Sequence, residues 1–124
     1  MSRPWLSIIL PVLNEAQTLA EALRRLEPWR AAGAEVIVVD GGSTDNSREL
    51  AAADADRVVA APRGRALQMN AGAAASAADL LVFLHADTTL PEEVPAALRA
   101  MHTQTCWGRF DVALDAPGLL LRTV

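Results

Sequence analysis

Short runs of apolar residues alternate with longer amphipathic stretches along the chain. The runs are rich in Val, Ile and Leu and are bounded by residues that favour turns, so they predict buried strands. These strands are expected over 6–10, 35–39, 57–60 and 80–84. Helices are expected between them, over 14–27, 47–53 and 66–78. Because strands and helices alternate, the pattern predicts an α/β fold with a mostly parallel sheet and helices on both faces.

Two of the expected helices carry further signals. Asn14 is a good N-cap and is followed at the capping-box spacing by Gln17, and Pro28 is expected to end the same helix. Small residues dominate the helix over 66–78, so it is predicted to lie very close to the sheet. Later elements are expected as a helix from Pro91 or Glu92 to about Met101, a strand over 106–114, a turn over 115–118 and the start of another element over 119–122.

The composition indicates one small domain over 1–124. The chain of 124 residues is 52% hydrophobic, which is enough for one buried core. Its net charge is -4, and no basic stripe interleaved with aromatic residues occurs, so nucleic acid is not an expected partner. Cys106 is the single cysteine, which favours a reducing, cytoplasmic location. No apolar stretch approaches the ~20 residues of a transmembrane segment, although peripheral attachment to the inner face of a membrane is compatible with the chain.

Two of the apolar runs lead to a carboxylate. Asp40 stands between the second strand and a Gly-Gly turn, and Asp87 lies just past the fourth strand. Ligands bind outside the carboxyl ends of strands in an open parallel sheet, so the two carboxylates are expected to converge on one polar, metal-assisted site. Asp40 then contacts a base or a ribose, or alternatively caps the next helix. Asp87 suits a hard cation such as Mg or Mn bound together with a diphosphate, or alternatively is an N-cap or loop residue.

Four further features suggest contacts with a ligand. The Arg-Gly-Arg loop over 63–65 suits a phosphate or a base carbonyl, although a solvated surface loop is equally compatible with it. Asn70 lies in the Ala-rich helix, where a polar side chain gains little unless it meets a partner. Glu15 opens a helix beside the strand ends without an evident capping role. His85 is either a site residue or a satisfied histidine at a strand end.

Several common site motifs are missing from the sequence. No G-x-G-x-x-G follows the first strand, which argues against a nicotinamide or flavin fold. The chain has no lysine and therefore no P-loop. Neither Ser43 nor Ser47 stands in a G-x-S-x-G elbow, so a hydrolase nucleophile is not indicated.

Four segments occur together in one order: Ser-Ile-Ile-Leu-Pro-Val-Leu-Asn-Glu over 7–15, Val-Val-Asp-Gly-Gly-Ser-Thr-Asp over 38–45, Arg-Gly-Arg-Ala-Leu-Gln-Met-Asn-Ala-Gly over 63–72 and Phe-Leu-His-Ala-Asp-Thr over 83–88. In this order they resemble the family 2 nucleotide-sugar glycosyltransferases. The resemblance extends from Leu6 to about Leu114. It is closest to a bacterial subgroup in which the metal turn reads His-Ala-Asp-Thr.

The resemblance implies a GT-A fold, which is a Rossmann-like layer, together with a UDP or GDP sugar as donor and a divalent metal, Mn or Mg. It also implies inverting transfer to an acceptor that is a lipid, a saccharide or a small molecule. Asp87 matches the metal-binding last acidic residue of the family's D-x-D motif, and His85 replaces the first. The candidate residues for the nucleotide sugar are Pro11, Asn14 and Glu15 at the nucleoside, Asp40 at the base, Gly64 and Arg65 over the nucleotide, and Asn70 and His85.

The family's catalytic base is usually an acidic residue well beyond the D-x-D turn. Asp111 and Asp115 follow Asp87 too closely to be assigned this role, so the base is expected beyond Val124 and the catalytic residue stays unassigned. The chain is accordingly predicted to be the donor-binding half of a GT-A domain that lacks its acceptor half.

Two other functions are compatible with parts of the sequence. One is a non-catalytic nucleotide-binding or assembly module that keeps only the donor half. The other is a nucleotidyltransferase, but the glycine-rich phosphate turn that it needs after the first strand is missing. An uncovered sheet edge in an incomplete domain favours association, so a homodimer is also expected as an option.

Overall fold

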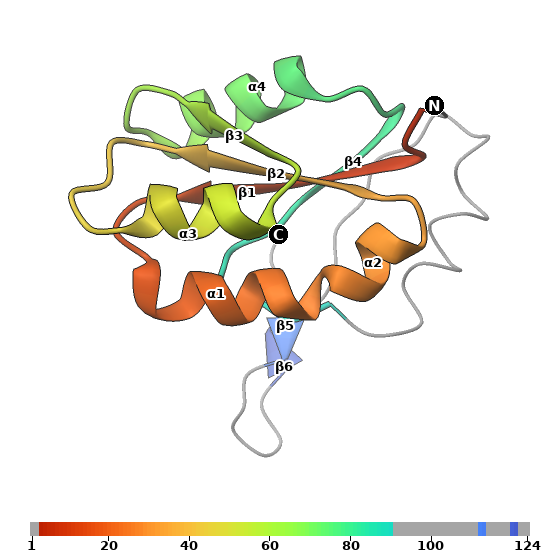
Figure 1. Cartoon of the computed structure of the whole chain (residues 1–124), viewed down its shortest axis with the longest axis horizontal. Helices are drawn as coiled ribbons and strands as arrows, with labels where there is room; N and C mark the ends of the chain where they lie inside the picture. Colours follow the sequence, from red (N-terminus) through yellow and green to blue (C-terminus); the bar gives the residue numbers. More distant parts are fainter. Residues whose placement is uncertain (1–2, 91–111, 114–119, 122–124) are drawn as a thin grey trace.

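The computed structural model describes residues 3–90, 112–113 and 120–121. Its centre is a four-stranded parallel sheet of β1 (Leu6–Val12), β2 (Glu35–Asp40), β3 (Arg57–Ala60) and β4 (Leu80–Phe83). The strand order is β3-β2-β1-β4, so the chain winds outward from β1 to β3 and then crosses to the other side of β1 (Figure 1). This order places a switch point between β1 and β4, where open α/β sheets bind ligands.

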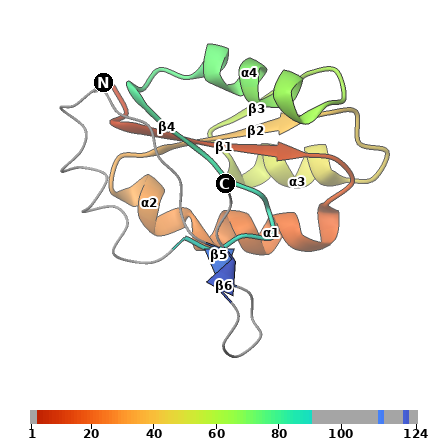
Figure 2. The same ribbon diagram turned by 180° about the vertical axis from the view of Figure 1, so that it is seen from behind.

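Helices cover both faces of the sheet, as the sequence predicts (Figures 1 and 2). The helices are α1 (Ala16–Arg25), α2 (Glu27–Ala31) and α3 (Ser47–Asp54) on one face and α4 (Arg65–Ala75) on the other. Side chains of β1 alternate between the two cores: Ile8 and Leu10 belong to the larger one, and Ile9 belongs to the smaller one, against which alanines of α4 pack. Every residue of β1 and β2 is buried, which explains their nearly unbroken apolar sequences.

α4 lies very close to the sheet because of one glycine. A Cβ atom added at Gly72 would stand 2.4 Å from Ile9 Cγ2 and 2.9 Å from Val39 Cγ2. No side chain larger than hydrogen fits in that gap without a shift of the helix or the strands. The prediction of a closely packed, small-residue helix is therefore confirmed.

Two prolines differ from the sequence-based expectation. Pro28 does not end the first helix, because α1 already ends at Arg25 and Pro28 lies in the first turn of α2, where a missing N–H costs nothing. The first strand is longer than the expected 6–10, because β1 continues through Pro11 to Val12. The ladder between β1 and β4 ends at Ile9, so no hydrogen bond to β4 is lost at Pro11.

The later part of the chain is described only at two short strands. β5 (Val112–Ala113) pairs antiparallel with β6 (Leu120–Leu121) in a separate two-stranded sheet. The expected helix from Pro91 or Glu92, most of the strand over 106–114, Cys106, Asp111 and Asp115 lie outside the described residues. Within the described residues, no helix has both the length and the apolar character that crossing a bilayer requires.

Candidate functional site

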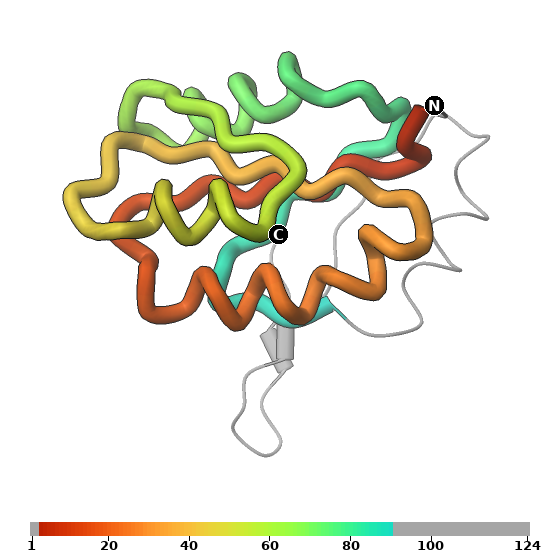
Figure 3. Tube along the Cα trace, viewed as in Figure 1, coloured from red at the N-terminus to blue at the C-terminus, as the bar shows by residue number. Residues whose placement is uncertain are grey.

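Two loops meet at the carboxyl end of the sheet, one after β1 and one after β2 (Figure 3). Asn14 joins them. Its Oδ1 accepts hydrogen bonds from the N–H groups of Thr44 at 2.7 Å and Asp45 at 3.3 Å. Its own N–H donates to Ser43 Oγ at 2.9 Å. The loop after β1 is therefore held along one side by the loop after β2.

The capping box expected at Asn14 and Gln17 is wrong. The N-cap of α1 is Glu15, and no side chain of its own segment caps the helix. Asn14 adopts a left-handed backbone with φ 52°, a conformation that asparagine tolerates better than most residues. With this backbone conformation, the side-chain amide of Asn14 reaches the neighbouring loop, and its oxygen accepts hydrogen bonds from backbone N–H groups there instead of from those of α1.

The first turn of α1 is instead capped by the loop after β2. Asp45 Oδ2 accepts a hydrogen bond from the Ala16 N–H at 3.2 Å, and Ser47 Oγ accepts one from the Glu15 N–H at 3.0 Å. The Ser47 hydroxyl donates in turn to Asp45 Oδ1 at 2.6 Å. This hydroxyl, followed by the backbone N–H groups of Ser47 and Ala16, lowers the pKa of Asp45 below its ordinary value of 3.8.

The lowered pKa of Asp45 predicts a pH-dependent contribution to stability. A carboxylate with a depressed pKa stabilises the fold above its unfolded-state value and loses that contribution as the pH falls through the folded-state value. We therefore expect the wild-type protein to exceed Asp45→Asn in free energy of unfolding at neutral pH, with the difference shrinking below pH 3.8. Urea unfolding of both proteins at several pH values measures this. A difference that stays constant into the acid range would contradict the proposed capping role.

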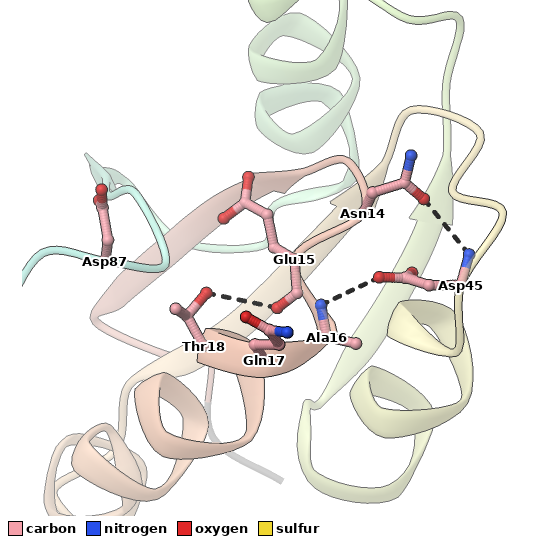
Figure 4. Close-up of a pocket in the computed structure, with 7 residues that line it drawn as sticks. All are labelled: Asn14, Glu15, Ala16, Gln17, Thr18, Asp45 and Asp87. Atoms are coloured by element: carbon pink, nitrogen blue, oxygen red, sulfur yellow. Dashed lines mark hydrogen bonds between the residues drawn. The ribbon is translucent and has the colours of Figure 1, made fainter.

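A hollow of about 530 Å³ opens beside these loops (Figure 4). Its lining residues come from the start of α1 and from the segments after β2 and β4: Asn14, Glu15, Ala16, Gln17, Thr18, Asp45 and Asp87. Figure 4 shows Glu15 between Asp87 and Asp45, and the Asp45 carboxylate is turned to the Ala16 N–H. Within the described part of the chain, no hydrogen bond or ion pair engages the Glu15 carboxylate. Glu15 therefore lines the hollow with its carboxylate open, and its role toward a ligand stays a prediction.

Asp87 lies in a turn just beyond β4. The turn is closed by the Thr88 N–H, which donates to the His85 carbonyl at 3.0 Å. Asp87 is exposed, and its Oδ1 accepts a hydrogen bond from the Thr88 hydroxyl at 3.3 Å. The carboxylate thus stands at the rim of the hollow with most of its acceptor capacity open to a ligand.

The structure does not bring Asp40 to the hollow that Asp87 lines. Asp40 is 1% exposed and does not line the hollow. Its carboxylate accepts hydrogen bonds from the N–H groups of Gly42 and Ser43, each at 3.1 Å, and Arg48 Nε lies 3.9 Å from Oδ2. It does not cap α3 either, because the N-cap of that helix is Asn46. A carboxylate at a strand end that is followed by two glycines can accept hydrogen bonds from the backbone N–H groups of its own turn, and Asp40 does so here.

The structure brings together two predicted residues that are distant in sequence. Arg65 Nη2, at the first position of α4, contacts Nε2 of His85 in the turn after β4. Gly64, the N-cap of α4, has φ 145°, a backbone conformation that only glycine adopts readily. The Arg-Gly-Arg loop and the turn that carries Asp87 are therefore neighbours.

Gln68 is a further buried residue beside the site that was not predicted from the sequence. Its side chain is 5% exposed, and its Nε2 donates to the carbonyls of Val12 at 2.9 Å and Val39 at 3.0 Å. Asn70, the residue predicted in the same helix, is exposed and makes no hydrogen bond with another described side chain. Helical spacing is the sequence signal that could have identified this residue. Gln68 lies four residues before Gly72 and therefore on the face of α4 that packs on the sheet.

The chain was compared with known proteins. The model of the family described as "Glycosyl transferase family 2" matches residues 7–119. An undecaprenyl-phosphate 4-deoxy-4-formamido-L-arabinose transferase from Pseudomonas paraeruginosa is 40% identical over 101 residues, which cover 72% of this chain and 30% of the relative. The transferase of the same name from Pseudomonas aeruginosa is 34% identical and covers 84% of this chain and 38% of the relative. The chain thus spans about a third of the length of these relatives.

Solved structures share the same fold. Glucosyl-3-phosphoglycerate synthase from Mycobacterium tuberculosis, crystallised with Mn²⁺, UDP and glucosyl-3-phosphoglycerate, aligns with a TM-score of 0.68 at 28% identity over 82% of this chain and 41% of that chain. A mannosyltransferase from Pyrobaculum calidifontis with GDP-Man and Mn²⁺ aligns with a TM-score of 0.63 at 28% identity over 78% of this chain and 31% of that chain. These neighbours confirm the expected GT-A fold. On the family match, the strand order and these similarities, the chain belongs to glycosyl transferase family 2.

Proposed function

We propose that this chain forms the donor-binding part of an inverting glycosyltransferase that uses a nucleoside diphosphate sugar, a UDP or GDP sugar, with a divalent cation. The observation that carries the proposal is the hollow at the switch point of the sheet, where Glu15 and Asp87 stand beside loops rich in backbone donors. Structural neighbours crystallised with UDP or GDP-Man support this choice of donor.

The residues at the rim of the hollow fit a hard divalent cation, Mn²⁺ or Mg²⁺. Asp87 offers a carboxylate whose hydrogen bonding within the described residues is a single long contact with Thr88. Among the residues that the structure describes, no cluster of three or more His, Cys, Asp and Glu could hold a metal ion alone. This favours the arrangement in which one or two protein carboxylates bind the cation and phosphate oxygens of the substrate complete its coordination. When bound, such a cation offsets the charge that develops on the departing diphosphate.

The other candidate residues have distinct roles in the proposal. Asn14 and Glu15 face the nucleoside, and Pro11 supports their loop from within β1. The exposed guanidinium of Arg65 lies beside the turn of Asp87, where it can bind a phosphate oxygen. Asp40 fixes the Gly-Gly turn and reaches a base only if that turn opens, and Asn70 remains a candidate on the surface of α4.

The reaction that we propose is a single displacement. An acceptor oxygen attacks the anomeric carbon and displaces the nucleoside diphosphate, with inversion at that carbon. A hydroxyl acceptor loses its proton to a base in this step, whereas a phosphate acceptor attacks through an oxygen that is already ionised. No described residue is assigned as the base. Relatives named for undecaprenyl phosphate favour a lipid-phosphate acceptor among the lipid, saccharide and small-molecule options, and such an acceptor would bring the protein to the inner face of a membrane.

Calorimetric titration of the protein with UDP and with GDP, each with and without Mn²⁺ or Mg²⁺, tests the donor and the cation together. We expect saturable binding of one nucleotide, strengthened at least about tenfold by a cation because the phosphates and Asp87 share it. The absence of cation-dependent binding for both nucleotides would refute the proposal.

Product analysis with a UDP or GDP sugar separates this function from its alternatives. Release of the nucleoside diphosphate indicates glycosyl transfer or hydrolysis, whereas formation of a nucleoside triphosphate and a sugar 1-phosphate when pyrophosphate is added indicates nucleotidyl transfer. Binding without any turnover indicates a donor-binding module.

A further inference from the structure

Gln68 occupies a position in α4 where three segments of the chain meet. Its amide nitrogen donates to the Val12 carbonyl at the end of β1 and to the Val39 carbonyl near the end of β2. Its amide oxygen accepts the Gly64 N–H at 3.3 Å, at the start of its own helix. One side chain therefore ties the Arg-Gly-Arg loop to the carboxyl ends of the two central strands.

The surroundings of Gln68 leave its amide little freedom. The side chain is 5% exposed, and a Cβ atom at Gly41 would stand 2.8 Å from its Cδ. The backbone N–H of Gln68 also donates to the Gly64 carbonyl at 2.8 Å, so Gly64 is held through both of its polar groups. The side chain reaches back to the N-cap N–H as the glutamine of a capping box does, from one residue further along the helix.

The next contacts lead from Gly64 to the candidate metal turn. Arg65 follows Gly64 directly, and its guanidinium contacts His85. His85 in turn closes the turn of Asp87 through its carbonyl. The strand ends, the arginine loop and the Asp87 turn are thus connected by consecutive bonds that begin at Gln68.

We propose that Gln68 is a positioning residue for donor binding. Its amide fixes the Gly64 peptide against β1 and β2 and thereby sets the place of Arg65 beside the Asp87 turn. The inference rests on the proposed function in one respect, because it assumes that the diphosphate of the nucleoside diphosphate sugar binds between Arg65 and Asp87.

An amide is the group that this position requires. Glutamine supplies two N–H donors for the two strand carbonyls and one acceptor for the Gly64 N–H. Glutamate keeps the acceptor and loses both donors, so its carboxylate would face two carbonyl oxygens. Methionine keeps the length and volume of the side chain and loses all three hydrogen bonds.

The test compares wild-type protein with Gln68→Met and with Ser7→Ala. Ser7 is a fully buried residue at the other end of β1, where its hydroxyl donates to Glu35 Oε2 at 2.8 Å and accepts from Ser76 at 2.6 Å. It lies about 16 Å along the strand from Val12. Both substitutions remove a buried polar side chain that belongs to β1 or bonds to it. Only Gln68→Met removes such a side chain beside the arginine loop.

Two readouts are needed. The first is hydrogen exchange of the Gly64 amide in the protein without ligand, which we expect to become at least about tenfold faster in Gln68→Met and unchanged in Ser7→Ala. The second is the affinity for UDP or GDP with Mn²⁺, which we expect to fall about 10- to 100-fold in Gln68→Met, the range for residues that orient a binding group, and to stay at the wild-type value in Ser7→Ala.

Each outcome decides one claim. Unchanged exchange at Gly64 in Gln68→Met overturns the positioning role, and so does faster exchange with wild-type affinity. Equal losses of affinity in both variants also overturn it, because a general loss of stability then explains the result. If the wild-type protein binds neither nucleotide, the proposed function fails, while the exchange measurement still decides whether Gln68 fixes the loop.

Discussion

Asp87→Ala is expected to abolish most of the cation-dependent binding of a nucleoside diphosphate while leaving the fold intact. Asp87 is exposed in a turn and contributes no side chain to either core, so its removal costs little stability. Loss of a direct cation ligand should lower the affinity measured with Mn²⁺ at least about 100-fold, which is the upper end of the effect seen for residues that only support such ligands. The affinity measured without a cation should change little.

Two further variants make this result interpretable. Asp87→Asn keeps the shape of the side chain and removes its charge, and we expect it to retain part of the cation-dependent affinity. Asp79→Ala is the matched control, because Asp79 is also an exposed carboxylate, lies at the opposite end of β4 and pairs with the exposed Arg3. Wild-type binding by Asp87→Ala, or an equal loss in Asp79→Ala, would remove Asp87 from the proposed site.

Gly72→Ala is expected to destabilise the protein by about 1 kcal/mol, although alanine is the better helix former. The propensity gain at an ordinary helical position is about 1 kcal/mol. Here the added methyl group would stand 2.4 Å from Ile9 Cγ2, so α4 must move away from the sheet or the strands must shift. Overpacking of this kind costs about 1–3 kcal/mol, and because the atoms in contact belong to buried β-branched residues, we expect the cost to exceed the propensity gain. Urea unfolding monitored by circular dichroism measures the net effect.

Ala74→Gly provides the comparison for Gly72→Ala. Ala74 is exposed in the same helix, so its replacement reports the helix propensity of α4 without any contact with the sheet. We expect a loss of about 1 kcal/mol at that position. If Gly72→Ala instead raises the free energy of unfolding, the close approach of α4 to β1 and β2 does not control stability.

The strands were predictable because their signal is local. Each apolar run is bounded by turn residues, and burial on both faces of β1 and β2 leaves almost no polar position to confuse the pattern. Helix ends were predicted less well. Pro28 suits the first turn of a helix as well as the end of one, and sequence alone does not say that a second helix, α2, begins there.

The candidate site was predicted in part, for a physical reason. Asp87 stands at the hollow as expected because a turn after a parallel strand must project at the carboxyl edge of the sheet. Asp40 has the same sequence context, but its two following glycines let the backbone fold back onto its carboxylate. Asn14 bonds to residues some thirty positions away, and no local pattern reports such a partner. The roles of these residues toward a nucleotide stay predictions.

The contact between the loops after β1 and β2 limits how this site can be re-engineered. Asn14 receives N–H groups from the second loop, and Asp45 returns a carboxylate to the first turn of α1, so each loop supplies the groups that complete the other. A graft that exchanges one of these loops between relatives leaves unmatched donors and acceptors on both sides. An exchange meant to change the preference for a nucleotide-sugar donor should therefore replace both loops together.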